Sequence, residues 1–161
     1  MLEKTGIPTS VELNSVKPSE KRLKEGPVAI IECFREIPCD PCFYSCPFEA
    51  IKEFEDINDK PKLDYQKCTG CGNCIASCPG LAIFVVDYNK NTISLPYEFL
   101  PIPAKGDIVI GLDREGKEVC KAEVSKVRDP EKNDKTAVIT IKVPKEYLME
   151  VRNIKVGDSH E

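Results

Sequence analysis

Tryptophan is absent from this 161-residue chain, histidine occurs once, and aromatic residues make up only 7%. The single histidine, His160, stands alone in the polar segment VGDSHE, so the chain offers neither a histidine general base nor a histidine metal site. It also lacks a Gly-rich phosphate loop after a strand and a nucleophile-elbow motif. We therefore expect no catalytic residues and no small-molecule substrate of its own.

Long apolar runs and a basic face are missing as well. The longest apolar run, LAIFVV at 81–86, is far shorter than the roughly 18–20 residues that span a bilayer. Residues 1–15 lack the apolar core of a secretory signal. Basic residues are mixed with acidic ones to a net charge of −4, and KRLKE at 21–25 is interpreted as solvated surface. These absences predict a cytoplasmic protein with no membrane span and no nucleic-acid partner.

Cysteine, in contrast, is abundant, with nine residues. In a reducing compartment such a set indicates metal or redox chemistry, and the odd count and missing export signal argue against disulfides. Zinc sites typically use two separated C-x2-C pairs, whereas eight of these cysteines fall into two longer runs. The ninth, Cys120, sits at an alternating β position and is interpreted as a small core residue.

The second cysteine run, from Cys68 to Pro79, reads C-x2-C-x2-C-x3-C-P, the spacing of [4Fe-4S] cubane sites in bacterial proteins. Three thiolates on a curled loop can bind three corners of one cubane. Gly70 and Gly72 let the backbone approach the inorganic sulfides and direct N–H groups at them. The fourth thiol, Cys78, belongs to a helical turn that points away, so it is expected to bind a different cluster.

The first run departs from this pattern at its leading position. Residues 39–47 supply the equivalents of the second, third and fourth cysteines, but the leading position is Glu36 and the nearest upstream thiol is Cys33. A longer loop, residues 34–38, could carry Cys33 to the missing corner; otherwise the site would hold a three-iron cluster, or Glu36 would fill the corner. The predicted ligands are Cys33, Cys39, Cys42 and Cys78 for the first cluster, and Cys46, Cys68, Cys71 and Cys74 for the second.

On these motifs, residues 28–88 resemble the two-cluster bacterial ferredoxin family. The resemblance implies a ferredoxin-like fold whose two [4Fe-4S] clusters lie close enough for rapid electron tunnelling. The phrases IECFREIPCDPC and CIASCPGLAIFVV, together with a β-rich tail, are also similar to the iron–sulfur subunits of flavin-dependent amine or amino-acid dehydrogenases. That second resemblance implies flavin-containing oxidoreductase subunits as partners.

The predicted fold class is α+β, a ferredoxin-like two-cluster domain followed by a small antiparallel β domain, either sheet or barrel. An internal repeat, CDPCFYSCPFEAI and CGNCIASCPGLAI, indicates pseudo-symmetry in the first domain. The expected organisation is an extended arm at 1–27, the cluster domain at 28–88, a proline-rich linker at 89–104, and a β-rich docking domain with a polar tail at 105–161.

Three functions are compatible with these features. The first is an electron-transfer subunit of a flavoenzyme complex, favoured by the arm and the β-rich tail, which a diffusible carrier does not need. The second is a free ferredoxin, for which a net charge of −4 is mild. The third is an iron–sulfur sensor or scaffold, although eight ligands suggest a conduit rather than one labile site.

Overall fold

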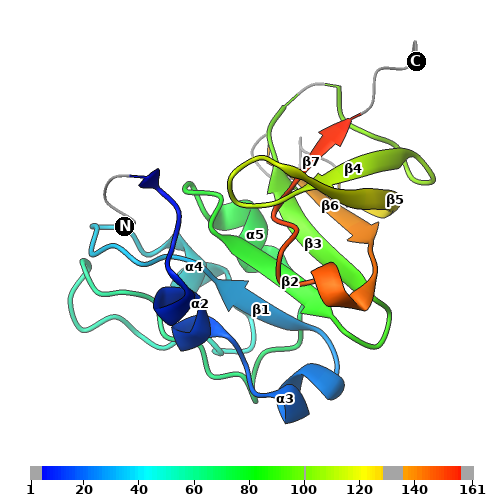
Figure 1. The fold of residues 1–161 in the computed structure, drawn as a ribbon. Helices are drawn as coiled ribbons and strands as arrows, with labels where there is room; N and C mark the ends of the chain where they lie inside the picture. The colour runs from blue at the N-terminus through cyan, green and yellow to red at the C-terminus, as the bar shows by residue number, and fades with distance from the viewer. Residues whose placement is uncertain (1–4, 100, 129–135, 157–161) are drawn as a thin grey trace.

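The computed structural model describes residues 5–99, 101–128 and 136–156, and its strands form one antiparallel sheet in the order β1-β2-β3-β6-β5-β4-β7 (Figure 1). The strands are β1 Val28–Ile31, β2 Ile83–Asp87, β3 Thr92–Tyr97, β4 Ile108–Leu112, β5 Glu118–Arg128, β6 Ala137–Lys142 and β7 Asn153–Val156. The helices are short: α2 Ser10–Val16, α3 Glu20–Lys24, α4 Pro41–Ser45, α5 Asn73–Ser77 and the 3-10 helix η1 Lys145–Tyr147. The α+β expectation therefore holds at the level of an antiparallel sheet with a few helices.

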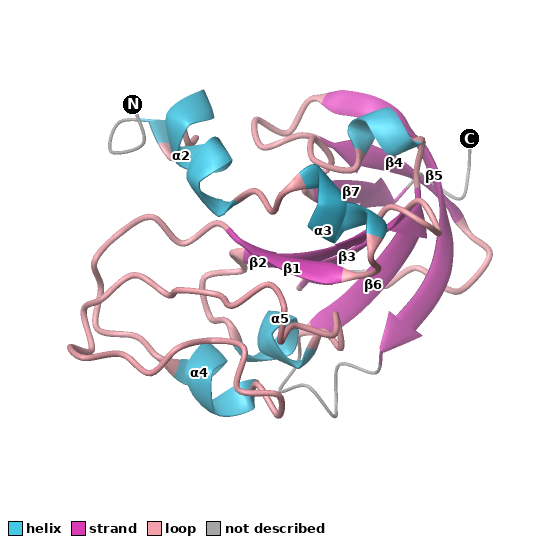
Figure 2. Cartoon of the chain, turned by 90° about the horizontal axis from the view of Figure 1, so that it is seen from below, coloured by secondary structure: helices cyan, strands magenta, loops and turns pink. Residues whose placement is uncertain are grey.

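The first two strands are buried on both faces and separate two apolar cores. Side chains alternate along a strand, so Val28 and Ile30 join the larger core under β3–β7, whereas Ala29 and Ile31 join a smaller core beside the cysteine loops. Figure 2 shows the resulting layers, with α4 and α5 on one side of β1 and β2 and with α2 and α3 on the other. This buried pair of strands is the support on which the cysteine loops are built.

The segment expected to be a linker, residues 89–104, contains β3. This strand pairs with β2 through Thr92–Ser94 and with β6 along its whole length, so the sheet runs without interruption from β1 to β7. Its proline, Pro96, lies beyond the part paired with β2, where a missing N–H costs no ladder hydrogen bond on that side. The two-domain arrangement is therefore not confirmed.

The strands expected after residue 105 are present. A turn over residues 113–116 joins β4 to β5, and β5 pairs with β6. One 3-10 turn precedes β7, which pairs with β4 at the end of the sheet. Residues 129–135 and the expected polar tail from residue 157 on, with His160, lie outside the described residues.

The N-terminal arm was expected to be extended but contains two short helices. A capping box formed by Thr9 and Glu12 begins α2, and the Ser19 hydroxyl accepts from the N–H of Arg22 at the start of α3. Leu23 of α3 is buried in the larger core. Among the residues described, no helix combines the length and the apolar character that crossing a bilayer would need.

Candidate metal centre

Two matching five-residue helices carry the repeated cysteine motif. In α4 and α5 the second helical residue is a buried cysteine, Cys42 or Cys74, and the residue after the helix is another cysteine, Cys46 or Cys78. Both terminal cysteines have extended backbones, with φ/ψ of −84°/109° and −76°/113°, because each precedes a proline, which disfavours the helical region. Each helix therefore presents one thiol from its own turn and one from a segment that leaves the helix.

The thiols around the first hollow are Cys33, Cys39, Cys42 and Cys78, the set predicted for the first cluster. The hollow has an empty volume of about 310 Å³, which includes the part open to solvent. Its apolar lining includes Ile31, Phe54 and Ile83. Glu36, the alternative ligand, is exposed and does not line it. The loop at 34–38 thus brings Cys33 to the position that the motif leaves empty.

The second hollow is lined by the other four predicted thiols, Cys46, Cys68, Cys71 and Cys74. It comprises about 320 Å³ by the same measure, with Ala29, Ile51, Leu63 and Val85 among its lining residues. Each hollow therefore draws three thiols from one motif and one from the other. Whether these eight thiols are cluster ligands stays a prediction.

Backbone N–H groups donate to two thiols of the second set. The amide of Ala29 in β1 lies 3.3 Å from Cys68 Sγ, and the amide of Ala50 lies 3.3 Å from Cys46 Sγ. Such bonds to sulfur are one way a protein sets the reduction potential of an iron–sulfur site. The Cys68 loop is pressed closely onto the start of β1: a Cβ added at Gly70, whose φ is +72°, would lie 2.4 Å from Pro27 Cβ.

Burial and mutual repulsion raise the pKa of the most enclosed thiols. Burial comes first for Cys42, followed by the charge of Cys78, and together they raise its pKa to about 11. Burial, followed by the charges of Cys68 and Cys71, raises the pKa of Cys74 to about 12. Without a bound cation these thiols are protonated at neutral pH, and metal binding there must release protons.

Two arginines that sequence reasoning did not identify hold the second cysteine loop. Arg22, interpreted from the sequence as solvated surface, is only 6% exposed, and its Nη2 donates to the Cys68 carbonyl at 2.8 Å. Arg128, at the end of β5, donates to the Cys71 carbonyl and to the Asn73 side chain, each at 3.2 Å. No sequence pattern indicates either contact, because both join segments more than forty residues apart.

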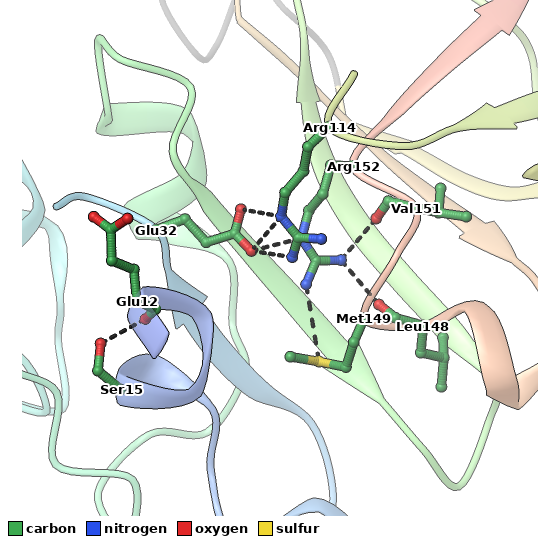
Figure 3. A network of polar contacts seen from close by, with 8 residues as sticks. All are labelled: Glu12, Ser15, Glu32, Arg114, Leu148, Met149, Val151 and Arg152. Atoms are coloured by element: carbon green, nitrogen blue, oxygen red, sulfur yellow. Dashed lines mark hydrogen bonds and ion pairs between the residues drawn. The ribbon is translucent and has the colours of Figure 1, made fainter. Parts of the chain in front are cut away.

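A buried ionic network flanks the first thiol set at Glu32, the residue before Cys33. Figure 3 shows the Arg114 and Arg152 side chains next to each other, facing the Glu32 carboxylate, which accepts from Arg114 Nε at 3.1 Å and from Arg152 Nε at 3.0 Å. Arg152 is 6% exposed, and its guanidinium carbon lies 4.9 Å from the centre of the Phe84 ring. Burial lowers the pKa of Arg152 to about 10, with Glu32 opposing that change. The network joins the end of β1 to the β4–β5 turn and to the residues preceding β7.

The donor chemistry suits an iron–sulfur cubane. Each hollow offers four thiols, which are the ligands that cubanes take, and the second adds backbone N–H donors and glycines of positive φ at Gly70 and Gly72. Within the described ranges no three His, Cys, Asp or Glu side chains gather closely enough to hold a single metal ion. Cys120 lies apart from both hollows, partly buried against the larger core.

Comparisons with known proteins identify the same region. Residues 35–82 match the model of the 4Fe-4S dicluster domain and include seven of the eight predicted ligands, Cys33 lying two residues before the match. One subunit of the Na(+)-translocating ferredoxin:NAD(+) oxidoreductase complex of Acetobacterium woodii is 50% identical over 58 residues, covering 36% of this chain and 17% of that protein. The PorD subunit of pyruvate synthase of Methanocaldococcus jannaschii is 41% identical over 54 residues, covering 34% of this chain and 60% of that protein.

A ferredoxin of Pyrobaculum islandicum is 38% identical over 47 residues, covering 29% of this chain and 42% of that protein. These matches span about a third of this chain and between a sixth and three-fifths of each relative. No solved structure matches the chain significantly. Residues 35–82 therefore form a domain of the 4Fe-4S ferredoxin type, the part of the chain that these relatives share.

Proposed function

We propose that the chain is a two-cluster electron relay, with one [4Fe-4S] cluster in each four-thiol hollow. The observation that carries this proposal is the pairing of thiols: each hollow takes three from one cysteine motif and one from the other. Bound clusters would each accept and release one electron at a time. The residues of this chain supply the ligands, exclude water through Ile31, Ile51 and Ile83, and direct backbone amides at sulfur.

Matched serine variants test the crossed ligation. Cys74→Ser removes a thiol of the second hollow, whereas Cys78→Ser, four residues later, removes one of the first. Electron paramagnetic resonance of the reduced variants should show damage to a different cluster in each. Loss of the same signal in both variants would refute the crossed assignment.

We further propose that the relay's partner is a flavin-containing subunit of an amine or amino-acid dehydrogenase. Support comes from residues 35–60, which carry the first cysteine motif: they contain seven acidic and three basic residues, a net charge of −4, and leave Ile37, Tyr44, Phe48 and Ile57 exposed. Exposed apolar side chains among charged ones are a feature of docking surfaces. Two of the relatives are named as subunits, one of an oxidoreductase complex and one of pyruvate synthase, in agreement with a bound partner.

The same residues also favour a second candidate, a free ferredoxin. The whole chain has a net charge of −4, so residues 35–60 carry all of it and the remainder is neutral. A concentrated acidic surface steers electrostatic encounters with several acceptors. A relay subunit forms a stable complex with its partner, whereas a free carrier binds its acceptors only briefly. Only the relay subunit should therefore be isolated together with a partner.

Anaerobic isolation of the tagged chain from its own cells separates the candidates. A relay subunit should be isolated together with a stoichiometric amount of flavin. Adding an amine or amino-acid substrate to the isolated complex should then reduce its clusters. Isolation as a monomer that reduces unrelated acceptors at useful rates would favour the free carrier and contradict the flavin complex.

A pair of matched isoleucine variants then locates the docking surface. Ile57 and Ile108 are 50% and 61% exposed, the first among residues 35–60 and the second on β4. Ile57→Glu should weaken partner binding about tenfold or more, equivalent to about 1.4 kcal/mol, while Ile108→Glu should change it little. Weakening by Ile108→Glu instead would move docking to residues 105–161 and contradict the assignment to residues 35–60.

A further inference from the structure

Arg22 is a buried cation with no carboxylate partner among the described residues. Its guanidinium instead donates to four backbone carbonyls: Nε to Tyr65 at 2.6 Å, Nη1 to Gly26 at 3.2 Å, and Nη2 to Pro27 at 3.0 Å and Cys68 at 2.8 Å. Carbonyl dipoles satisfy the hydrogen-bonding needs of the guanidinium but leave its unit positive charge uncompensated. A buried charge is costly without compensation, so a neighbouring negative charge is expected.

A cluster bound by the second thiol set would supply that negative charge, because Arg22 donates to the backbone carbonyl of Cys68. Two hydrogen bonds hold Cys68 in this region: its carbonyl accepts from Arg22, and its Sγ accepts from the Ala29 amide. Gly70, two residues later in the same loop, lies close against Pro27. Arg22 also bonds the carbonyls of Gly26 and Pro27, which lead into β1. The arginine therefore fixes both sides of the contact between the Cys68 loop and β1.

The rest of the arm secures Arg22 in this position. The Tyr65 hydroxyl donates to the Val16 carbonyl at 2.8 Å, so Tyr65 is tied to the arm at both its side chain and its backbone. The side-chain amide of Asn89 donates to the Lys24 carbonyl at 3.1 Å, and Leu23 is buried in the larger core. These contacts attach α3 to the sheet and to the Cys68 loop, and α3 lies outside the residues that match the dicluster model.

We propose that Arg22 is a positioning residue that raises the reduction potential of the second cluster and orders its Cys68 loop. This inference rests on the proposed two-cluster function with Cys68 as a ligand. One-electron reduction makes a cluster more negative, so a nearby fixed positive charge stabilises the reduced form and raises the potential. Because Arg22 contacts the Cys68 loop and no thiol of the first hollow, the second cluster should be affected more than the first.

Two variants that retain donors but differ in charge test the inference. Arg22→Lys keeps the positive charge, whereas Arg22→Gln removes it; Lys21→Gln removes the same charge from the exposed neighbouring position. Potentials are measured by anaerobic titration of the holoprotein followed by electron paramagnetic resonance, with the signals assigned from the Cys74→Ser and Cys78→Ser variants. Iron and sulfide content is measured on every sample.

Arg22→Gln is expected to disfavour reduction of the second cluster at least tenfold relative to Arg22→Lys, equivalent to about 59 mV for one electron. The first cluster should change less, and Lys21→Gln should change neither by that amount. Loss of the second cluster from Arg22→Gln but not from Arg22→Lys would also support the role of the charge.

Equal second-cluster potentials in the two Arg22 variants, or equal shifts of both clusters, would overturn the inference. Equal loss of the second cluster from both variants would overturn the electrostatic role too. A wild-type protein with only one cluster would instead contradict the proposed function itself.

Discussion

Replacing Glu32 with glutamine removes the one carboxylate shared by two arginines. The Glu32 side chain is 8% exposed and that of Arg152 is 3% exposed, so neither charge is well solvated in the folded protein. Arg114 also binds the same carboxylate, with 15% of its side chain exposed. Glu32→Gln keeps the shape of the side chain but leaves two neighbouring guanidinium groups with no negative partner between them.

The expected cost of this substitution is large for one residue. Removing one partner of a buried pair costs about 3–5 kcal/mol, because the remaining charge stays buried. In a chain of this size 1 kcal/mol shifts the melting temperature by roughly 2–4 °C, so Glu32→Gln should lower it by about 6–20 °C. An exposed pair provides the control: Glu118 lies 3.7 Å from Lys155 with both side chains about 60% exposed, and Glu118→Gln should cost about 0–1 kcal/mol.

Anaerobic thermal unfolding, followed by far-ultraviolet circular dichroism and by the visible absorption of the clusters, measures both variants. Because Glu32 adjoins Cys33, the cluster signal should be lost at the same lowered temperature as the sheet. A Glu32→Gln variant as stable as Glu118→Gln would refute the reasoning that the network is buried and coupled.

Three further predictions concern the thiol sites and the sheet. The Cβ of Gly70→Ala would overlap the side chain of Pro27, whereas that of Gly116→Ala would enter open space. Gly70→Ala should therefore lower the free energy of unfolding by about 1–3 kcal/mol more than Gly116→Ala, and it should lower the iron content. Equal losses of stability would contradict the close contact. Protein without clusters should lose stability as pH rises above about 9, because the pKa values of Cys42 and Cys74 lie near 11 and 12 in the folded protein but near 9 in the unfolded chain. Urea unfolding measures this, and a free energy of unfolding that increases with rising pH would contradict it. Ile139→Ala, at a fully buried position of β6, should cost about 2–5 kcal/mol and lower the melting of sheet and clusters together, whereas two separate transitions would favour independent domains.

The sequence predicted those features that depend on spacing along the chain. Cysteine spacing predicted which thiols share a hollow, because C-x2-C turns and a proline after the last cysteine fix local geometry. The β-rich composition after residue 105 likewise predicted strands in this part of the chain, where the structure has β4, β5, β6 and β7. The placement of Cys33 beside Cys39 and Cys42 was one of three possibilities that the sequence left open, and the structure has Cys33 in the same hollow.

Features that depend on pairing between distant segments could not be predicted in this way. Residues 92–97 form a central strand in spite of Pro96, because the pairing with β2 ends before the proline and no donor is missing on that side. Arg22 lies in a run of charged residues whose composition indicates a solvated surface, yet carbonyls from residues 26, 27, 65 and 68 surround it. Only the folded chain brings those acceptors together.

Anaerobic iron and sulfide analysis, combined with electron paramagnetic resonance of the reduced protein, tests the central claim of two clusters most directly. The arrangement of eight thiols predicts about eight irons per chain and the signal of two spin-coupled reduced cubanes, with Cys33→Ser losing the first cluster alone. About four irons, or a three-iron signal in the oxidised wild-type protein, would contradict the claim that both hollows hold complete cubanes.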